Sequence, residues 1–298
     1  MSIKGGENLK IGVFMGGISS EREISIKTGT AILKSLLRQG YDAYKIELNK
    51  DNMLKAFIEN DYDVAFLALH GVFGEDGRIQ GLLDIIGKKY TGSSMISSAI
   101  SMDKDLTKKI AISEGIKVPK TYKVENINEI KSFPVVVKPV IEGSSVGLYI
   151  CDNLEKVKEA ILELKGKEVT IEQFIEGEEL TVGVVLGEPL GVLKIKPKAG
   201  LYDYKSKYTQ GMTEYEYPAI IDNKDYKKAM EYARIIHNSL KMGGISRSDF
   251  ILSKDDLYFL EVNSCPGMTE TSLVPKLATL QGYTFDDLIR KVIEETIL

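Results

Sequence analysis

The sequence predicts an α/β domain followed by two domains built on antiparallel sheets with helices to one side. Strand and helix patterns alternate over the first ninety residues, whereas later strands follow one another as hairpins. The 298 residues, 43% of them apolar and 28% charged, are enough for two or three cores. We expect domains over residues 1–93, 94–177 and 178–298.

Composition narrows the class of protein and its partners. No apolar run approaches the roughly eighteen residues of a membrane helix, and the start MSIKGGENLK has no apolar signal region. The net charge of -4 gives no general attraction to nucleic acid. The two cysteines, Cys151 and Cys265, lack zinc or disulfide spacing. We therefore expect a cytoplasmic protein without nucleic-acid or membrane partners.

The first domain has the pattern of a parallel sheet. The apolar run LKIGVFMGG (9–17) predicts a buried strand, and the helix after it has Ser20 and Glu23 as a possible capping box and Gly40 as its C-cap. DAYKIEL, a helical LKAFIE and the strand VAFLAL complete a βαβαβ unit. Ligands of such sheets bind at the carboxyl ends of the strands. The loops GGISSERE and HGVFGEDG (70–77) are therefore candidates for a site.

The second domain contains a lysine positioned beside a glycine- and serine-rich turn. A helix over 101–115 precedes PVVVKPVIEGSSVGLYI, which predicts a strand, a turn and an antiparallel strand. Alternation places Val135 and Val137 on one face and Lys138 on the other, beside EGSSVG. Backbone amides in such a turn can bind phosphate oxygens. A solvated lysine and an ordinary turn remain the alternative.

The third domain brings acidic residues together on a hairpin. If residues 253–257 form a five-residue loop between SRSDFILS and LYFLEVNS, Asp249 faces Glu261, and Arg247 and Asn263 share that face. A loop of four would separate the two carboxylates. All-oxygen ligands suit Mg²⁺ or Mn²⁺, although a solvated polar face is also possible. The five-residue loop assigns the opposite, core face to Phe250, Leu252, Tyr258, Leu260 and Val262.

Other segments are weighed in the same way. The polar stretch from Lys196 to Tyr215 is too long for an idle connection and predicts a lid. His237 lies on a helix face with apolar residues and is expected in a core, and Cys265, with no histidine signalled nearby, is expected to be structural. His70 is in a ligand-side loop, where it either braces the loop or contacts a substrate. No GxGxxG, P-loop or nucleophile motif is present.

A set of motifs in a fixed order, spread over nearly the whole chain, resembles the D-alanine:D-alanine ligase family of the ATP-grasp superfamily. The motifs are GGISSEREIS (16–25), LHGVFGEDGRIQG (69–81), YTGSS (90–94), SMDK (101–104), VVKPVIEGSSVG (136–147), YDYKSKY (202–208), RSDF (247–250) and EVNSCPGMTETSLVP (261–275).

This resemblance implies that ATP lies between the sheets of the second and third domains. Two D-alanine molecules would be joined through a D-alanyl phosphate to supply peptidoglycan precursor. The ATP-binding positions would be Lys104, Lys138, Ser145, Glu172, Ile175, Glu179 and Lys207. Two Mg²⁺ or Mn²⁺ ions would be held by Asp249, Glu261 and Asn263. The family usually has a lysine where this chain has Gln173, so an adenine contact differs there.

The same resemblance assigns the substrate positions. Glu21, Ser144, Tyr208, Arg247 and the amide of Gly267 would take part in catalysis, and Glu21, His70, Ser272 and Leu273 would bind the substrates. The tyrosine at position 208 resembles the members of the family that form a dipeptide, and D-serine stays open as a second substrate. The family also implies a homodimer. Other ATP-grasp ligases, a nucleotide-binding regulator without turnover, and a plain phosphotransferase are the competing hypotheses.

Overall fold

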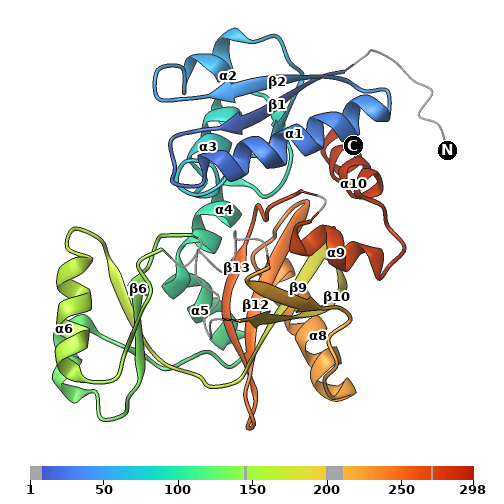
Figure 1. The fold of residues 1–298 in the computed structure, drawn as a ribbon. Helices are drawn as coiled ribbons and strands as arrows, with labels where there is room; N and C mark the ends of the chain where they lie inside the picture. Colours follow the sequence, from blue (N-terminus) through green and yellow to red (C-terminus); the bar gives the residue numbers. More distant parts are fainter. Residues whose placement is uncertain (1–8, 144–145, 199–210, 270) are drawn as a thin grey trace.

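The computed structural model describes residues 9–143, 146–198, 211–269 and 271–298. In these residues the chain forms three sheets, which are separate in space (Figure 1). The first sheet lies at one end of the molecule, and the other two lie side by side below it in this view. Fold class and element order agree with the sequence, so the predicted α/β and α+β architecture is confirmed.

The first sheet is parallel, as the βαβαβ pattern predicts. Its strand order is β2-β1-β3-β4. The N-cap of helix α1 is Glu21, and its side chain makes no capping hydrogen bond. The predicted capping box is therefore wrong, because Ser20 lies one residue before the N-cap position. Gly40 has a φ of +82°, as a C-cap glycine requires. The elements are β1 (Lys10–Gly16), α1 (Arg22–Arg38), β2 (Asp42–Leu48), α2 (Lys55–Glu59), β3 (Val64–Leu67), α3 (Arg78–Ile85) and β4 (Lys89–Tyr90).

The second sheet is antiparallel, in the order β5-β8-β6-β7. Val135 and Val137 are buried in its core, whereas Val136 and Lys138 line a cavity on the opposite face, so the predicted alternation is confirmed. The elements are α4 (Met95–Met102), α5 (Lys104–Ser113), β5 (Thr121–Tyr122), a 3₁₀ turn (Val124–Glu129), β6 (Val135–Pro139), β7 (Tyr149–Cys151), α6 (Leu154–Glu163) and β8 (Val169–Gln173).

The third sheet is also antiparallel, in the order β11-β10-β9-β12-β13. The two ends of the predicted lid belong to this sheet, because Lys196 and Pro197 pair with Glu214 and Thr213. Residues 199–210 of the predicted lid lie outside the described residues. The elements are β9 (Glu178–Val185), β10 (Glu188–Pro197), β11 (Thr213–Glu216), α8 (Asn223–Ser239), β12 (Ile245–Leu252), β13 (Leu257–Asn263), α9 (Leu273–Thr279) and α10 (Phe285–Ile297).

The hairpin of β12 and β13 reaches the predicted register by a different route. Leu252 pairs with Leu257, so the connecting loop has four residues, 253–256, and the predicted loop of five is wrong. A register shift next to Asp249 leaves Leu260 as an extra residue in β13. The bulge restores the pairing of Asp249 with Glu261, and both carboxylates lie on one face.

The bulge also changes which side chains of β13 enter the core. Leu257 and Phe259 are fully buried, and the Phe259 ring packs edge-on against Phe250 at 5.7 Å. The predicted core positions Tyr258 and Leu260 are wrong, because after the shift they point away from this core and are only partly buried. Leu260 instead lines the cavity between the second and third sheets.

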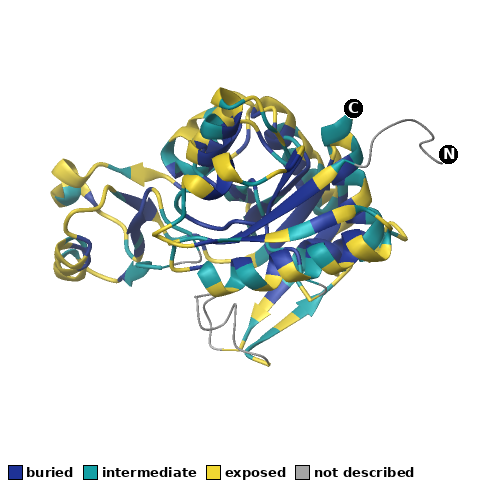
Figure 2. Ribbon diagram, turned by 90° about the horizontal axis from the view of Figure 1, so that it is seen from above, coloured by how far each residue is buried: buried dark blue, intermediate teal, exposed yellow. Residues whose placement is uncertain are grey.

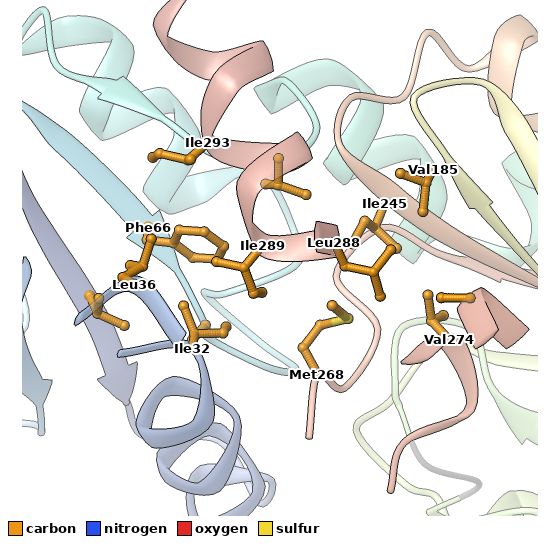
Figure 3. Close-up of a cluster of buried hydrophobic side chains, with 14 of the residues drawn as sticks. Ile32, Leu36, Phe66, Val185, Ile245, Met268, Val274, Leu288, Ile289 and Ile293 are labelled. Atoms are coloured by element: carbon orange, nitrogen blue, oxygen red, sulfur yellow. The ribbon is translucent and has the colours of Figure 1, made fainter. Parts of the chain in front are cut away.

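The first and third sheets share a hydrophobic core, which fixes them against each other. Figure 3 shows Ile32 of α1 and Phe66 of β3 beside Ile289 and Ile293 of α10, and the cluster continues to Val274 of α9. The second sheet has a separate core, which contains Val137, Ile171 and Val157. In Figure 2 the buried strands run through the interior, and exposed residues cover the outer helices. Of the helices described, none is long and apolar enough to span a membrane.

Candidate functional site

Two adjoining cavities lie where the sheets meet. One, of about 320 Å³, is lined by loops of the first sheet and by the segment after β13. The other, of about 250 Å³, lies between the second and third sheets. Lys104, Glu142 and Glu261 line both cavities. A group transferred from a molecule in one cavity to a molecule in the other would therefore pass these three residues.

The first cavity receives side chains from the carboxyl ends of the parallel strands, as such sheets favour. Glu21 follows β1, and His70 follows β3. Glu21 is buried, and a Cβ added to Gly143 would lie 2.8 Å from its Oε2. Glycine at position 143 thus allows the turn of the second domain to approach the first domain closely.

His70 is held by neighbours on both sides of its ring. Its Nδ1 lies 3.4 Å from Glu75 Oε1 and its Nε2 lies 3.1 Å from Thr28 Oγ1. These contacts favour the bracing role for His70, which nevertheless lines the first cavity. The prediction that Cys265 has no histidine nearby is wrong, because its sulfur lies within 4.8 Å of the ligand atoms of His70 and Glu75.

Glu172 and Lys138 line the second cavity on the side of β6, and a third buried charged residue, Lys108, pairs with Glu172. Glu172 of β8 makes an ion pair with Lys108 of α5, and its Oε2 lies 3.2 Å from Lys138 Nζ. Lys108 is 3% exposed and Glu172 is 2% exposed. Isolated charges at such depth are costly, so the ion pairs are what keep the three groups charged.

Burial acts differently on the pKa values of the two lysines. Burial, together with the charge of Lys138, lowers the pKa of Lys108 to about 8. Burial also lowers the pKa of Lys138, but the charges of Glu172 and Glu261 outweigh it and the net shift is upward. Lys108 was not among the predicted site residues. Its spacing of four from Lys104 places both on one helix face, which is the signal that could have found it.

Lys104 connects the two sides of the site. It is the first residue of α5, after the N-cap Asp103, which accepts hydrogen bonds from the next turn. Its Nζ donates to the carbonyl of Glu142 at 2.7 Å and lies 3.4 Å from Glu261 Oε2. Lys104 therefore contacts both the turn of the second domain and the carboxylate of β13.

The opposite wall of the second cavity is acidic. Asp249 and Glu261 are cross-strand partners, and Asn263 lies on the same face, opposite Arg247. Arg247 donates two hydrogen bonds to Asp249, at 3.0 and 2.8 Å, and Thr181 donates a third at 2.5 Å. Two carboxylates on neighbouring strands repel each other unless positive charge lies beside them. This donor set, made only of oxygens, fits a hard divalent cation.

The remaining predicted residues divide between the two cavities. Gly267, Ser272 and Leu273 line the first cavity, and a Cβ on Gly267 would lie 3.4 Å from Ser272 Oγ. Ile175 and Glu179 line the second. His237 is buried and lies 2.8 Å from Ser246 Oγ, and burial lowers its pKa to about 4, so its predicted core position is confirmed. Ser144, Ser145, Lys207 and Tyr208 fall outside the described residues.

A parallel α/β domain, followed by two antiparallel sheets that face each other across a cavity with lysines on one wall and carboxylates on the other, defines the ATP-grasp class of ligases. Comparison with known families agrees with this class. The model for the C-terminus of D-ala D-ala ligase matches residues 100–294, and the model for its N-terminus matches residues 50–93. The chain belongs to the D-alanine–D-alanine ligase family, as the motifs predict.

Similar proteins cover nearly the whole chain. A D-alanine--D-alanine ligase from Fusobacterium nucleatum is 59% identical over 96% of this chain and 99% of its own length. A D-alanine--D-alanine ligase from Bacillus anthracis, solved in complex with ATP, has a TM-score of 0.85 at 35% identity, covering 98% of both chains. The VanG D-Ala:D-Ser ligase from Enterococcus faecalis has a TM-score of 0.84 at 28% identity, covering 97% of this chain and 100% of its own.

Proposed function

We propose that this chain joins two D-alanine molecules to D-alanyl-D-alanine with hydrolysis of ATP to ADP and phosphate, for cell wall synthesis. The single observation that carries this proposal is the pair of adjoining cavities that share Lys104 and Glu261. One cavity has the cations and apolar walls that a nucleotide needs. The other has the small polar surroundings that amino acids need.

ATP is proposed to bind in the second cavity. The apolar side chains of Val136, Ile150, Phe174, Ile175 and Leu260 line it and suit the adenine ring. Lys138 and Lys104, with the turn that contains Ser145, would bind the phosphates, and Glu179 would bind the ribose. The carboxylate of Glu172 makes ion pairs with Lys108 and Lys138, so we propose that it orients Lys138 toward the phosphates. The strand that carries Glu172 would border the adenine ring.

Two divalent cations, Mg²⁺ or Mn²⁺, are proposed to be held by Asp249, Glu261 and Asn263. The two carboxylates and the amide oxygen lie on one face of the hairpin, and both carboxylates already have a cationic side chain as a neighbour. The ions would screen the phosphate charge. Joining a carboxylate and a phosphate brings two anions together, and fixed positive charge at that point is a large source of catalysis.

The first D-alanine is proposed to bind with its ammonium on Glu21 and to attack the γ-phosphate through its carboxylate. ADP leaves, and a D-alanyl phosphate forms. The amine of the second D-alanine, whose carboxylate is held by Ser272 and Leu273, then attacks the acyl carbon and releases phosphate. The tetrahedral oxyanion would be stabilised by Arg247, which Asp249 fixes in place, and by the amide of Gly267.

Several finer features belong to the same proposal. Ser144 and Tyr208 would complete a hydrogen-bonded link between turn, lid and substrate, and the lid with Lys207 would exclude water from the acyl phosphate. We further propose the domain division at residues 93 and 177, a homodimer, and a cytoplasmic location.

A coupled assay of ADP release, with D-alanine alone and with D-alanine plus D-serine or D-lactate, tests the function. We expect phosphate release and a chromatographically identified dipeptide with D-alanine. A nucleotide-binding regulator would release no phosphate with any of them, and a phosphotransferase would accumulate a phosphorylated acceptor. Faster turnover with D-alanine plus D-serine than with D-alanine alone would move the assignment toward the activity named for the Enterococcus faecalis relative.

A further inference from the structure

Three side chains with different metal-ligating atoms meet beneath the first cavity. They are the imidazole of His70, the carboxylate of Glu75 and the thiol of Cys265, and their ligand atoms all lie within 4.8 Å of one another. His70 and Glu75 come from the loop after β3, whereas Cys265 comes from the segment after β13. The cluster therefore joins the first domain to the third.

The three ligands are held in place by other contacts of the protein. His70 and Glu75 are 5% and 7% exposed, and the second ring nitrogen of His70 is oriented by Thr28. The backbone amide of Cys265 donates to Asn263 Oδ1 at 2.8 Å, and its thiol lies 3.7 Å from the carbonyl oxygen of Leu67. Orientation of ligands by such neighbours strengthens metal binding, because less ordering is required when the ion arrives.

The chemistry of these ligands differs from that of the acidic hairpin. One thiolate, one imidazole and one carboxylate are typical ligands of Zn²⁺ and Cd²⁺, whereas Asp249, Glu261 and Asn263 offer oxygen only. We propose that His70, Glu75 and Cys265 form a binding site for a thiophilic divalent cation such as Zn²⁺. His70 and Glu75 line the first cavity, which provides the route of entry and leaves room for a fourth ligand such as water.

Binding of this ion releases the thiol proton to solvent and forms a metal–sulfur bond without any change of oxidation state. The bound ion links the loop 70–77 to the segment that carries Gly267 and Ser272. The proposal about this site does not rest on the proposed ligase function, and metal binding can be measured without any turnover of substrate.

Cd²⁺ titration of the full chain in saturating Mg²⁺ tests the proposal. Mg²⁺ occupies oxygen ligands, and the ultraviolet thiolate-to-Cd²⁺ charge-transfer absorption reports only a cadmium–sulfur bond. We expect this absorption to saturate at one Cd²⁺ per chain. Cys265→Ser should abolish the absorption and weaken Cd²⁺ binding, measured by equilibrium dialysis, at least about 100-fold, since a ligand matters more than its supporting neighbours.

Two further variants keep the test decisive if Cys265→Ser folds poorly. Glu75→Gln should retain the absorption and weaken binding roughly tenfold. The matched control is Cys151→Ala, which removes the other thiol, in the core of the second domain, and should change neither quantity. The proposal is overturned if the native chain shows no charge-transfer absorption, or if the absorption survives in Cys265→Ser or disappears in Cys151→Ala.

Discussion

The two walls of the second cavity carry opposite charge, and they are stabilised in different ways. On the side of β6, Lys108 and Lys138 share the single carboxylate of Glu172, so the group keeps one net positive charge. On the side of β12 and β13, Asp249 and Glu261 have Arg247 and Lys104 as neighbours. Each wall thus uses a lysine of α5, Lys108 for the basic wall and Lys104 for the acidic wall. In the basic wall one carboxylate is shared by two lysines, whereas each carboxylate of the acidic wall has its own cationic neighbour.

This difference indicates what each wall does when ligands bind. The basic wall has an unbalanced positive charge and can accept phosphate without rearrangement. In the acidic wall, Lys104 lies between the carbonyl of Glu142 and the carboxylate of Glu261. If divalent cations bind Glu261 as proposed, one of them would replace Lys104 beside this carboxylate and free the lysine for a phosphate. Removal of the central carboxylate from each wall should therefore have different consequences.

Glu261→Ala should produce the largest effect, a loss of turnover of at least about 1000-fold, because it removes a carboxylate that would hold the cations. The free energy of unfolding without divalent cations should not fall, since one of two repelling carboxylates has gone. Phosphate release and urea denaturation measure the two quantities. Turnover within tenfold of the native chain would remove the acidic wall from the mechanism.

Glu172→Gln should mainly reduce stability, by about 3 kcal/mol, because two buried lysines lose their shared counterion. The loss is limited by Lys108, whose pKa of about 8 lets it become neutral at modest cost. Urea denaturation measures the change. Glu178→Gln is the matched control, because it breaks an exposed ion pair with Lys194 and should cost less than about 1 kcal/mol. Equal losses in the two variants would contradict the comparison.

The sequence allowed the faces of both walls to be predicted, but not their internal partners. Two-residue alternation in β6 was sufficient to place Lys138, and the family motifs marked Asp249 and Glu261. Leu260 could not be placed, because a bulge and a four-residue loop give the same pairing as a five-residue loop without a bulge. In this hairpin the bulge pairs Phe250 with Phe259, and their rings pack in the core, a contact that two-residue periodicity alone does not reveal.

Long-range contacts explain the other omissions. Lys108 and Glu172 are 64 residues apart, and their ion pair joins the second sheet to α5, whose Ala111 is buried in the core of the third sheet. Cys265 meets His70 because α9, α10 and the first sheet share one core, which no local pattern reveals. Local periodicity thus predicts which face a residue occupies, whereas the residue it meets is decided by how the domains pack.

The smallest predicted effect uses pH to change the charge of Lys108, beside the basic wall. Burial, with the charge of Lys138, lowers the pKa of Lys108 to about 8, so this lysine loses its proton as the pH rises through that value. Bound phosphate favours the charged lysine, so ATP affinity should be full below pH 8 and fall as the pH rises through it. Glu172 lies between Lys108 and the cavity, so the lysine would act on a bound phosphate without touching it. A charge acting in this way is worth about 0.7 kcal/mol, which is roughly a threefold change in the Kd of ATP between pH 7 and 9. Calorimetry of ATP binding measures the change, and Lys108→Met should bind with the same Kd at both pH values. A threefold change that persists in Lys108→Met would instead place the titrating group elsewhere.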